Sequence, residues 1–211
     1  MRQRIMTHNF SKSLQHEREQ ALEADKFYVE VLHATDIVRF NSDLESDMEM
    51  QRKDIDLQVT IRGTVFNISE KFRDKDFGDL YIEVFSKYPH TKGWMHTGSP
   101  DAVVYFTPQN VYWITHKSLK TFCFEVLFPA IPTNWYEEIY KSKKTIVSKN
   151  LLIKDTYCKI NLIQAHNFDG NHWETIGVSI CFDALKNFEV KFKKVSKPFF
   201  PFEVPNHTQN S

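Results

Sequence analysis

One stretch of the chain, DIDLQVTIRGTVFNISEKFR over residues 54–73, constrains the fold more than any other. Apolar and polar residues alternate over residues 55–61 and again over residues 64–73, which is the period of a half-buried β-strand. Arg62 and Gly63 separate the two runs, and two such residues are enough to form a tight β-hairpin. The sequence therefore predicts a hairpin with one mainly apolar face and one polar face.

The length of the turn decides which side chains face each other across this hairpin. With a two-residue turn, the numbers of paired residues sum to 125, so that Asp56 lies opposite Ser69 and Asp54 lies opposite Lys71. A three-residue turn or a bulge shifts the sum to 126 and sets Asp56 opposite Glu70. The first register leaves Glu70 alone on the apolar face, and the sequence does not choose between the two registers.

Patterns along the rest of the chain predict a mixed α/β (α+β) protein. Ser11 or Ser13 is expected to start a helix that reaches about residue 33, and the acidic residues 41–54 are expected to form a loop. Strands are predicted over residues 35–40, 79–86, 101–106 and 111–116 and near 145–153, 157–164 and 174–182, and longer helices over 117–128 and 134–142. We expect a flexible arm over 1–10, a single domain over 11–198 and a tail over 199–211.

Composition limits the classes of function. The formal net charge is zero, so a nucleic-acid-binding role would need a local basic patch. Cys123, Cys158 and Cys181 form no CxxC pair and are interpreted as buried free thiols, which predicts a reducing, cytoplasmic compartment. The sequence has no 18-residue apolar run, and it contains no P-loop, GxGxxG or GxSxG motif.

Acidic and basic side chains of the predicted hairpin can carry chemistry. Asp56 opens the first strand, and Glu70 and Lys71 lie near the end of the second. Two neighbouring carboxylates favour a divalent cation, and Mg²⁺ prefers oxygen ligands and keeps several waters. Such a metal can activate water against a phosphodiester while a lysine stabilises the negative charge that develops. The competing interpretation is a solvated sheet edge on which Lys71, Arg73 and Asp54 only pair across the hairpin.

The order of these features resembles the PD-(D/E)xK nuclease superfamily. The resemblance rests on Asp56 in DIDLQV, on Glu70-Lys71 in NISEKFR and on Glu17 or Glu19 in QHEREQ, and it extends over about residues 11–116. The run from QRKDID through ISEKFRDKDFGDLYIEVFS to GW also resembles poorly characterised phage and bacterial members with an EK(I/F)R-KD-GD signature. The resemblance implies a restriction-endonuclease-like fold, in which a helix, a three-stranded meander, a helix and a further strand build a mixed central sheet with flanking helices. We expect a C-terminal elaboration of that core.

The resemblance also implies a Mg²⁺-dependent DNA nuclease, with Mn²⁺ as the alternative metal, working in the host cytoplasm if the chain is phage-encoded. Asp56 would be the principal metal ligand and Glu70 the second, and Lys71 would position or activate the water. Glu83 and Glu17 are the reserve ligands.

This sequence departs from the superfamily pattern two residues before the lysine, where Ser69 occupies the acidic slot. Either Glu70 or Glu83 takes over as a ligand, or the site is degenerate and no longer cuts. The alternative function is therefore a DNA- or protein-binding module, such as a phage-encoded regulator or inhibitor. Arg73 or Lys75 is expected to hold phosphate, and DNA is the expected partner, with a homodimer or a protein partner left open.

Overall fold

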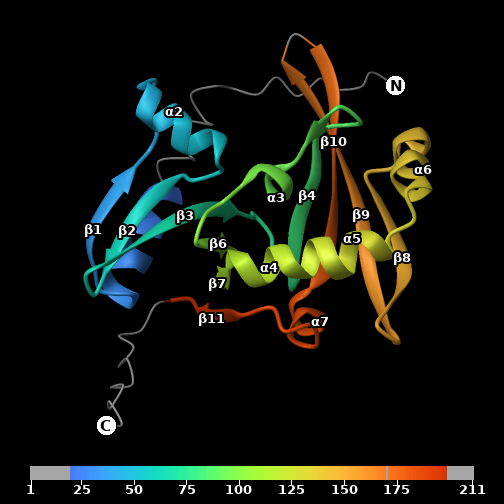
Figure 1. The fold of residues 1–211 in the computed structure, drawn as a ribbon. Helices are drawn as coiled ribbons and strands as arrows, with labels where there is room; N and C mark the ends of the chain where they lie inside the picture. The colour runs from blue at the N-terminus through green and yellow to red at the C-terminus, as the bar shows by residue number, and fades with distance from the viewer. Residues whose placement is uncertain (1–19, 170, 199–211) are drawn as a thin grey trace.

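The computed structural model describes residues 20–169 and 171–198 and shows a mixed α/β protein with two β-sheets (Figure 1). One sheet has six strands in the order β1-β2-β3-β6-β7-β11, and the other has five in the order β5-β4-β10-β9-β8. Neighbouring strands are antiparallel throughout, except that β3 and β6 run parallel. The expected arm over residues 1–10 and tail over 199–211 lie outside the described residues.

The strands and helices have the following bounds. The six-stranded sheet contains β1 (Ala34–Arg39), β2 (Leu57–Ile61), β3 (Thr64–Phe72), β6 (Ala102–Phe106), β7 (Asn110–Thr115) and β11 (Phe192–Ser196). The five-stranded sheet contains β4 (Asp79–Lys87), β5 (Thr91–Lys92), β8 (Ile146–Ile153), β9 (Thr156–Asp169) and β10 (Asn171–Cys181). The helices are η1 (Phe27–Val31), α2 (Glu45–Arg52), α3 (Trp94–Thr97), α4 (His116–Phe122), η2 (Cys123–Leu127), α5 (Phe128–Ala130), α6 (Asn134–Ser142) and α7 (Phe182–Lys186).

A helix at the start of the described chain covers one face of the six-stranded sheet. Residues 20–26 are α-helical and continue directly into η1. Phe27 and Tyr28 are fully buried there and pack in one cluster with Leu57, Ile68 and Phe106 of the sheet. Alternate residues of β2 and β3 point into this cluster, which leaves their other face to the polar residues, whereas β6 is buried on both faces.

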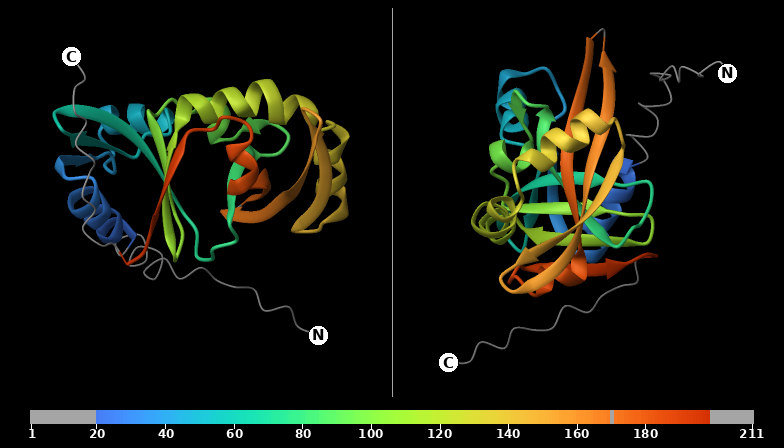
Figure 2. Two further views of the ribbon diagram at one scale, coloured as in Figure 1. Left: turned by 90° about the horizontal axis from the view of Figure 1, so that it is seen from below. Right: turned by 90° about the vertical axis from the view of Figure 1, so that its right-hand side faces the viewer.

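The second core lies between the other face of the six-stranded sheet, the helices and the five-stranded sheet. Val103 and Ile114 from the first sheet share it with Leu80 and Val178 from the second. The helical run of α4, η2 and α5 lies across both sheets (Figure 2). The connection from β3 to β6 leaves the first sheet, contributes β4, β5 and α3 beside the second, and then returns. The two sheets therefore meet beside the end of β3.

Helix α2 corrects the expectation of a loop over residues 41–54. The helix has no fully buried residue, and its few apolar residues, Met48 and Met50, are only half-buried, so the sequence gives little apolar signal for it. Charge pairs support it instead: Arg52 Nη1 lies 2.7 Å from Glu45 Oε1, and Lys53 Nζ lies 2.7 Å from Glu49 Oε1. A helix of this kind, with no fully buried residue, is held by side-chain pairs on its surface and by its tertiary connections.

Most other expected elements are confirmed, with small shifts at their ends. The strands predicted over residues 35–40, 101–106 and 111–116 correspond to β1, β6 and β7. The strand predicted over 79–86 is β4, but it pairs with β10 and β5 instead of continuing the sheet of β3. Cys123 and Cys158 are buried as expected, whereas Cys181 is exposed at the end of β10. Over the described residues no helix is long and apolar enough to cross a membrane.

Candidate active site

The β2–β3 hairpin adopts the two-residue turn. Arg62 and Gly63 both have positive φ, at 52° and 76°, which is the backbone of the tight turn that suits the twist of two strands. Leu57 pairs with Ile68 and Gln58 pairs with Asn67, so that the numbers of partners sum to 125. The alternative register, with a sum of 126, is not adopted. The side chains of β3 therefore divide between the two faces of the sheet by simple alternation.

Asp54 and Lys71 form an ion pair on the polar face. Lys71 Nζ lies 2.8 Å from Asp54 Oδ1, and Ser69 donates a hydrogen bond of 2.7 Å from its hydroxyl to Asp54 Oδ2. Ser69 is fully buried, and the pair itself is only slightly exposed. A Cβ atom built on Gly98 would lie 3.1 Å from Asp54 Cβ, so the backbone of residue 98 closes the other side of the aspartate. Asp54 is thus held by a hydroxyl, an ammonium and tight packing.

Asp56, the expected principal metal ligand, lies beside this pair without lining the cavity described below. Its Oδ2 accepts a hydrogen bond of 2.7 Å from the backbone N–H of Glu70, and its own N–H donates to the carbonyl of Ile68. Burial raises the pKa of Asp56, and the nearby Lys71 ammonium partly offsets that rise. Asp56 therefore serves to tie the start of β2 to β3, while Asp54 is the aspartate that meets the lysine.

Glu70, the expected second ligand, points to the opposite face of β3. Its carboxylate accepts hydrogen bonds from Arg39 Nη1 at 2.8 Å and from the Tyr28 hydroxyl at 3.0 Å, and its side chain is 6% exposed. Burial raises the pKa of Glu70, although the Arg39 guanidinium acts in the other direction. The charge of Asp56 raises the pKa of Glu70 further, so the two carboxylates interact, and their expected sharing of one metal ion stays a prediction.

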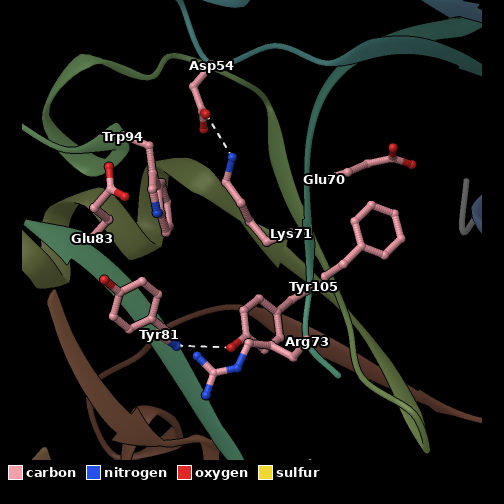
Figure 3. A pocket seen from close by; sticks show the side chains of 9 residues that line it. Asp54, Glu70, Lys71, Arg73, Tyr81, Glu83, Trp94 and Tyr105 are labelled. Carbon is pink, nitrogen blue, oxygen red and sulfur yellow. Dashed lines mark hydrogen bonds and ion pairs between the residues drawn. The ribbon is translucent and has the colours of Figure 1, made fainter. Parts of the chain in front are cut away.

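A cavity of about 390 Å³ opens where β3 meets β4 (Figure 3). Its lining includes the Asp54–Lys71 pair and, from the β4 side, Glu83, Tyr81 and Trp94. Figure 3 shows Lys71 directed at Asp54, while the carboxylate of Glu70 points away from both. The cavity thus gathers residues from both sheets, and the polar face of the hairpin forms one wall. Its complete lining is Asp54, Glu70, Lys71, Phe72, Arg73, Tyr81, Glu83, Trp94 and Tyr105.

Glu83 brings a second carboxylate to the cavity. Burial raises its pKa, a hydrogen bond from the backbone N–H of Trp94 and the charge of Lys71 lower it, and the charge of Asp54 raises it. Glu83 and Asp54 therefore repel each other across a cavity in which Lys71 attracts both. A Cβ atom on Gly93 would lie 2.7 Å from Glu83 Cγ, so the glycine allows the glutamate its position.

Arg73 and Lys75, the expected phosphate-binding residues, differ in position. Arg73 lines the cavity, with its guanidinium carbon 5.6 Å from the centre of the Tyr81 ring and Nη2 3.9 Å from Asp79 Oδ1. Lys75 is exposed on the following loop and does not line the cavity. Glu17, the other reserve ligand, lies outside the described residues.

Asp54, Tyr81, Trp94 and Tyr105 were not assigned to the site from the sequence, although all four line the cavity. Asp54 was visible as the cross-strand partner of Lys71 in the 125 register, and alternation along β4 puts Tyr81 on the same side as Glu83. Trp94 and Tyr105 carry no comparable signal, because they enter through α3 and through a strand whose residues are all buried. Within the described part of the chain, no group of three or more His, Cys, Asp and Glu side chains is arranged to hold a metal ion.

No family model matches the chain, and comparisons with curated proteins and with solved structures likewise find no match. The arrangement itself defines what this site can do chemically. Two partly buried carboxylates, an ammonium and a guanidinium share one cavity; in proteins, carboxylates are ligands of divalent cations, and ammonium and guanidinium groups pair with phosphate.

Proposed function

We propose that the chain is a metal-dependent DNA nuclease of PD-(D/E)xK type, with Asp54, Lys71 and Glu83 at its centre. The observation that carries the proposal is the Asp54–Lys71 ion pair, 2.8 Å long, which faces the Glu83 carboxylate across one cavity. In this assignment Glu83, from β4, supplies the carboxylate that the sequence lacks at Ser69. Asp54, and not Asp56 as expected from the sequence, takes the role of the aspartate in the PD-(D/E)xK pattern.

Strand order supports the same proposal. A helix, the antiparallel meander β1-β2-β3 and then β6, parallel to β3, follow one another as the resemblance leads us to expect of a restriction-endonuclease-like core. The departure lies in the connection from β3 to β6, which holds β4, β5 and the short α3 where that core would have one helix. In the proposed enzyme this excursion has a function, since it carries Glu83 to the cavity.

The residues present fit a magnesium ion held in the usual way, by one or two carboxylates, water and substrate phosphate. Asp54 and Glu83 would hold the ion, and its charge would relieve the repulsion between them. Bound there, Mg²⁺ or Mn²⁺ supplies a water activated for attack on a phosphodiester.

The remaining side chains position the reactants. Ser69 orients Asp54 through its 2.7 Å hydrogen bond. The Lys71 ammonium attracts both carboxylates, and it stabilises the negative charge that builds on the phosphate. Arg73 binds the phosphate from the other side of the cavity, because its guanidinium can donate two parallel hydrogen bonds to phosphate oxygens.

A degenerate, non-cutting DNA- or protein-binding module is the second candidate. It is favoured by the combination of Ser69 in the acidic slot with a Lys71 ammonium that Asp54 already neutralises. A salt-bridged lysine of this kind stabilises the hairpin without any substrate. The two candidates share a fold and a cavity, and they differ in whether metal-dependent cleavage occurs.

Cleavage assays on the full chain separate the candidates. Supercoiled, linear and single-stranded DNA are incubated with Mg²⁺, with Mn²⁺ and with chelator, using wild type, Asp54→Asn, Lys71→Met and Glu83→Gln. We expect metal-dependent cutting by wild type and a loss of at least about 100-fold in each variant, the usual effect of removing one stabilising group from a transition state. Circular dichroism and urea unfolding establish that each variant is folded.

Asp155→Asn and Lys159→Met are the matched controls, because both residues are exposed on the β8–β9 hairpin and neither lines the cavity. Both controls should cut like wild type. No cutting under any condition favours the binding module, and cutting that survives all three cavity substitutions removes the site assigned here.

A further inference from the structure

Phe77 presents an open aromatic ring beside the cavity. It is 63% exposed and lies on the loop that joins β3 to β4. The guanidinium carbon of Arg73, which lines the cavity, is 5.5 Å from the centre of the Phe77 ring and 5.6 Å from that of Tyr81. Arg73 therefore lies against both rings and leaves most of Phe77 open to solvent.

The loop that carries Phe77 is held in place by Asp76. The Asp76 carboxylate accepts hydrogen bonds from the backbone N–H of Gly78 at 2.9 Å, the Thr107 hydroxyl at 2.8 Å and the Asn110 amide at 2.8 Å. Thr107, which follows β6, and Asn110, which begins β7, are themselves buried. An exposed aromatic ring on a loop fixed to the core loses little conformational entropy when it binds a ligand.

Cations and aromatic rings alternate along this side of the cavity. Lys71 Nζ lies 5.4 Å from the centre of the Trp94 ring, and Arg73 lies against Phe77 and Tyr81. Single-stranded nucleic-acid sites combine these two groups, because the cations contact phosphates while bases stack on the rings. An internal base of a duplex has both faces covered by its neighbours, so away from a duplex end an open ring takes only a base that is unpaired or flipped out.

We propose that the site binds its DNA strand unpaired, with one base stacked on Phe77 and the adjacent phosphate held by Arg73. The inference rests on the proposed nuclease and names its substrate class: single-stranded DNA, a single-stranded flap or a frayed end. A purely structural Phe77 would only cover Arg73, and leucine would then replace it without effect.

Binding is measured by fluorescence anisotropy in chelator, with one labelled sequence presented as a single strand, as a blunt duplex and as a duplex with a flap. The variants are Phe77→Leu, which keeps an apolar cover but has no aromatic face, and Phe77→Trp, which keeps the face. Phe168→Leu is the matched control, because Phe168 is 67% exposed on β9. A 2-aminopurine base in the strand reports stacking by fluorescence quenching.

We expect single-stranded and flapped DNA to bind at least about tenfold more tightly than the blunt duplex. Phe77→Leu should weaken binding of the unpaired strand about tenfold and abolish the quenching, while Phe77→Trp and Phe168→Leu retain both. Equal affinity of wild type for the duplex and the single strand would overturn the inference. So would single-strand binding that Phe77→Leu leaves unchanged.

Cleavage of the same three substrates separates this inference from the nuclease assignment. Binding that depends on Phe77 without metal-dependent cutting removes the nuclease and leaves the unpaired-strand site. Cutting of the blunt duplex at the same rate in wild type and Phe77→Leu keeps the nuclease and removes the unpaired-strand site.

Discussion

Glu70 and Lys71 are consecutive in the chain, and β3 turns their side chains to opposite faces of the six-stranded sheet. Lys71 meets Asp54 at 2.8 Å on the polar face, whereas Glu70 meets Arg39 at 2.8 Å on the face covered by the N-terminal helix. Glu70 therefore borders the cavity without directing its carboxylate toward Lys71, and the carboxylates on the Lys71 side of the cavity are those of Asp54 and Glu83.

Glu70→Gln tests this division of roles. The change removes a carboxylate that accepts hydrogen bonds from Arg39 and Tyr28, so we expect the free energy of unfolding to fall by about 2 kcal/mol. Urea unfolding at neutral pH measures the loss. DNA cleavage should stay within a fewfold of wild type. Loss of cleavage with unchanged stability would return Glu70 to the active site.

Gly93→Ala tests the placement of Glu83. The added methyl would lie 2.4 Å from the carbonyl oxygen of Glu83 and 2.7 Å from its Cγ, so β4 must shift. We expect a loss of about 2 kcal/mol in stability, typical of overpacking, together with a marked loss of cleavage.

Gly63→Ala is the control for this experiment. Gly63 has a φ of +76° and no atom within 4 Å of an added Cβ, so alanine there costs about 1 kcal/mol through the backbone alone. Its cleavage activity should remain that of wild type. Equal losses of cleavage in Gly63→Ala and Gly93→Ala would mean that activity follows stability and not the position of Glu83.

We expect Glu83→Gln to raise the free energy of unfolding relative to wild type, by an amount that depends on pH. Burial raises the pKa of Glu83 in the folded state, so the folded protein binds a proton that the unfolded chain has released in the window between the two pKa values. Stability from this group is therefore fully present below the unfolded pKa and is lost as the pH rises through that window. We expect Glu83→Gln to unfold at higher urea than wild type at pH 8 and at a similar concentration at pH 4. An equal difference at both pH values would contradict this account.

Metal binding should stabilise the folded chain through the cavity carboxylates. A Mg²⁺ concentration about 100 times the Kd would add about 2.7 kcal/mol to the free energy of unfolding, and chelator would reverse the gain. Thermal unfolding of wild type and Asp54→Asn, with and without Mg²⁺, measures the effect. The variant should show little or no gain. An equal Mg²⁺ effect in both proteins would place the ion elsewhere.

The strands and the hairpin were open to prediction because their burial alternates with period two. The register in which the numbers of paired residues sum to 125 pairs Asp54 with Lys71 and Ser69 with Asp56. The choice between 125 and 126 required the turn geometry, which depends on the left-handed backbone of Arg62 and Gly63.

The rest of the candidate site comes from contacts between distant segments. From the sequence, the strand that carries Glu83 is expected to continue the sheet of β3. In the structure this strand, β4, pairs with β10 and so belongs to the second sheet. That pairing depends on Gly177, where an added Cβ would lie 2.4 Å from the Tyr81 ring. Local periodicity describes each strand separately and carries no information on which partner it finds.

The pairing of β4 with β10 sets the order in which the site can be assembled during synthesis. All the cavity-lining residues belong to residues 54–105, yet β4 borders β10, which ends at Cys181. A nascent chain that has emerged only to residue 116 contains the complete lining but lacks the long strand that holds Glu83 in place. The cavity can therefore reach its final form only after nearly the whole described chain has left the ribosome, and truncation of the C-terminal half removes the site without removing any residue that lines it.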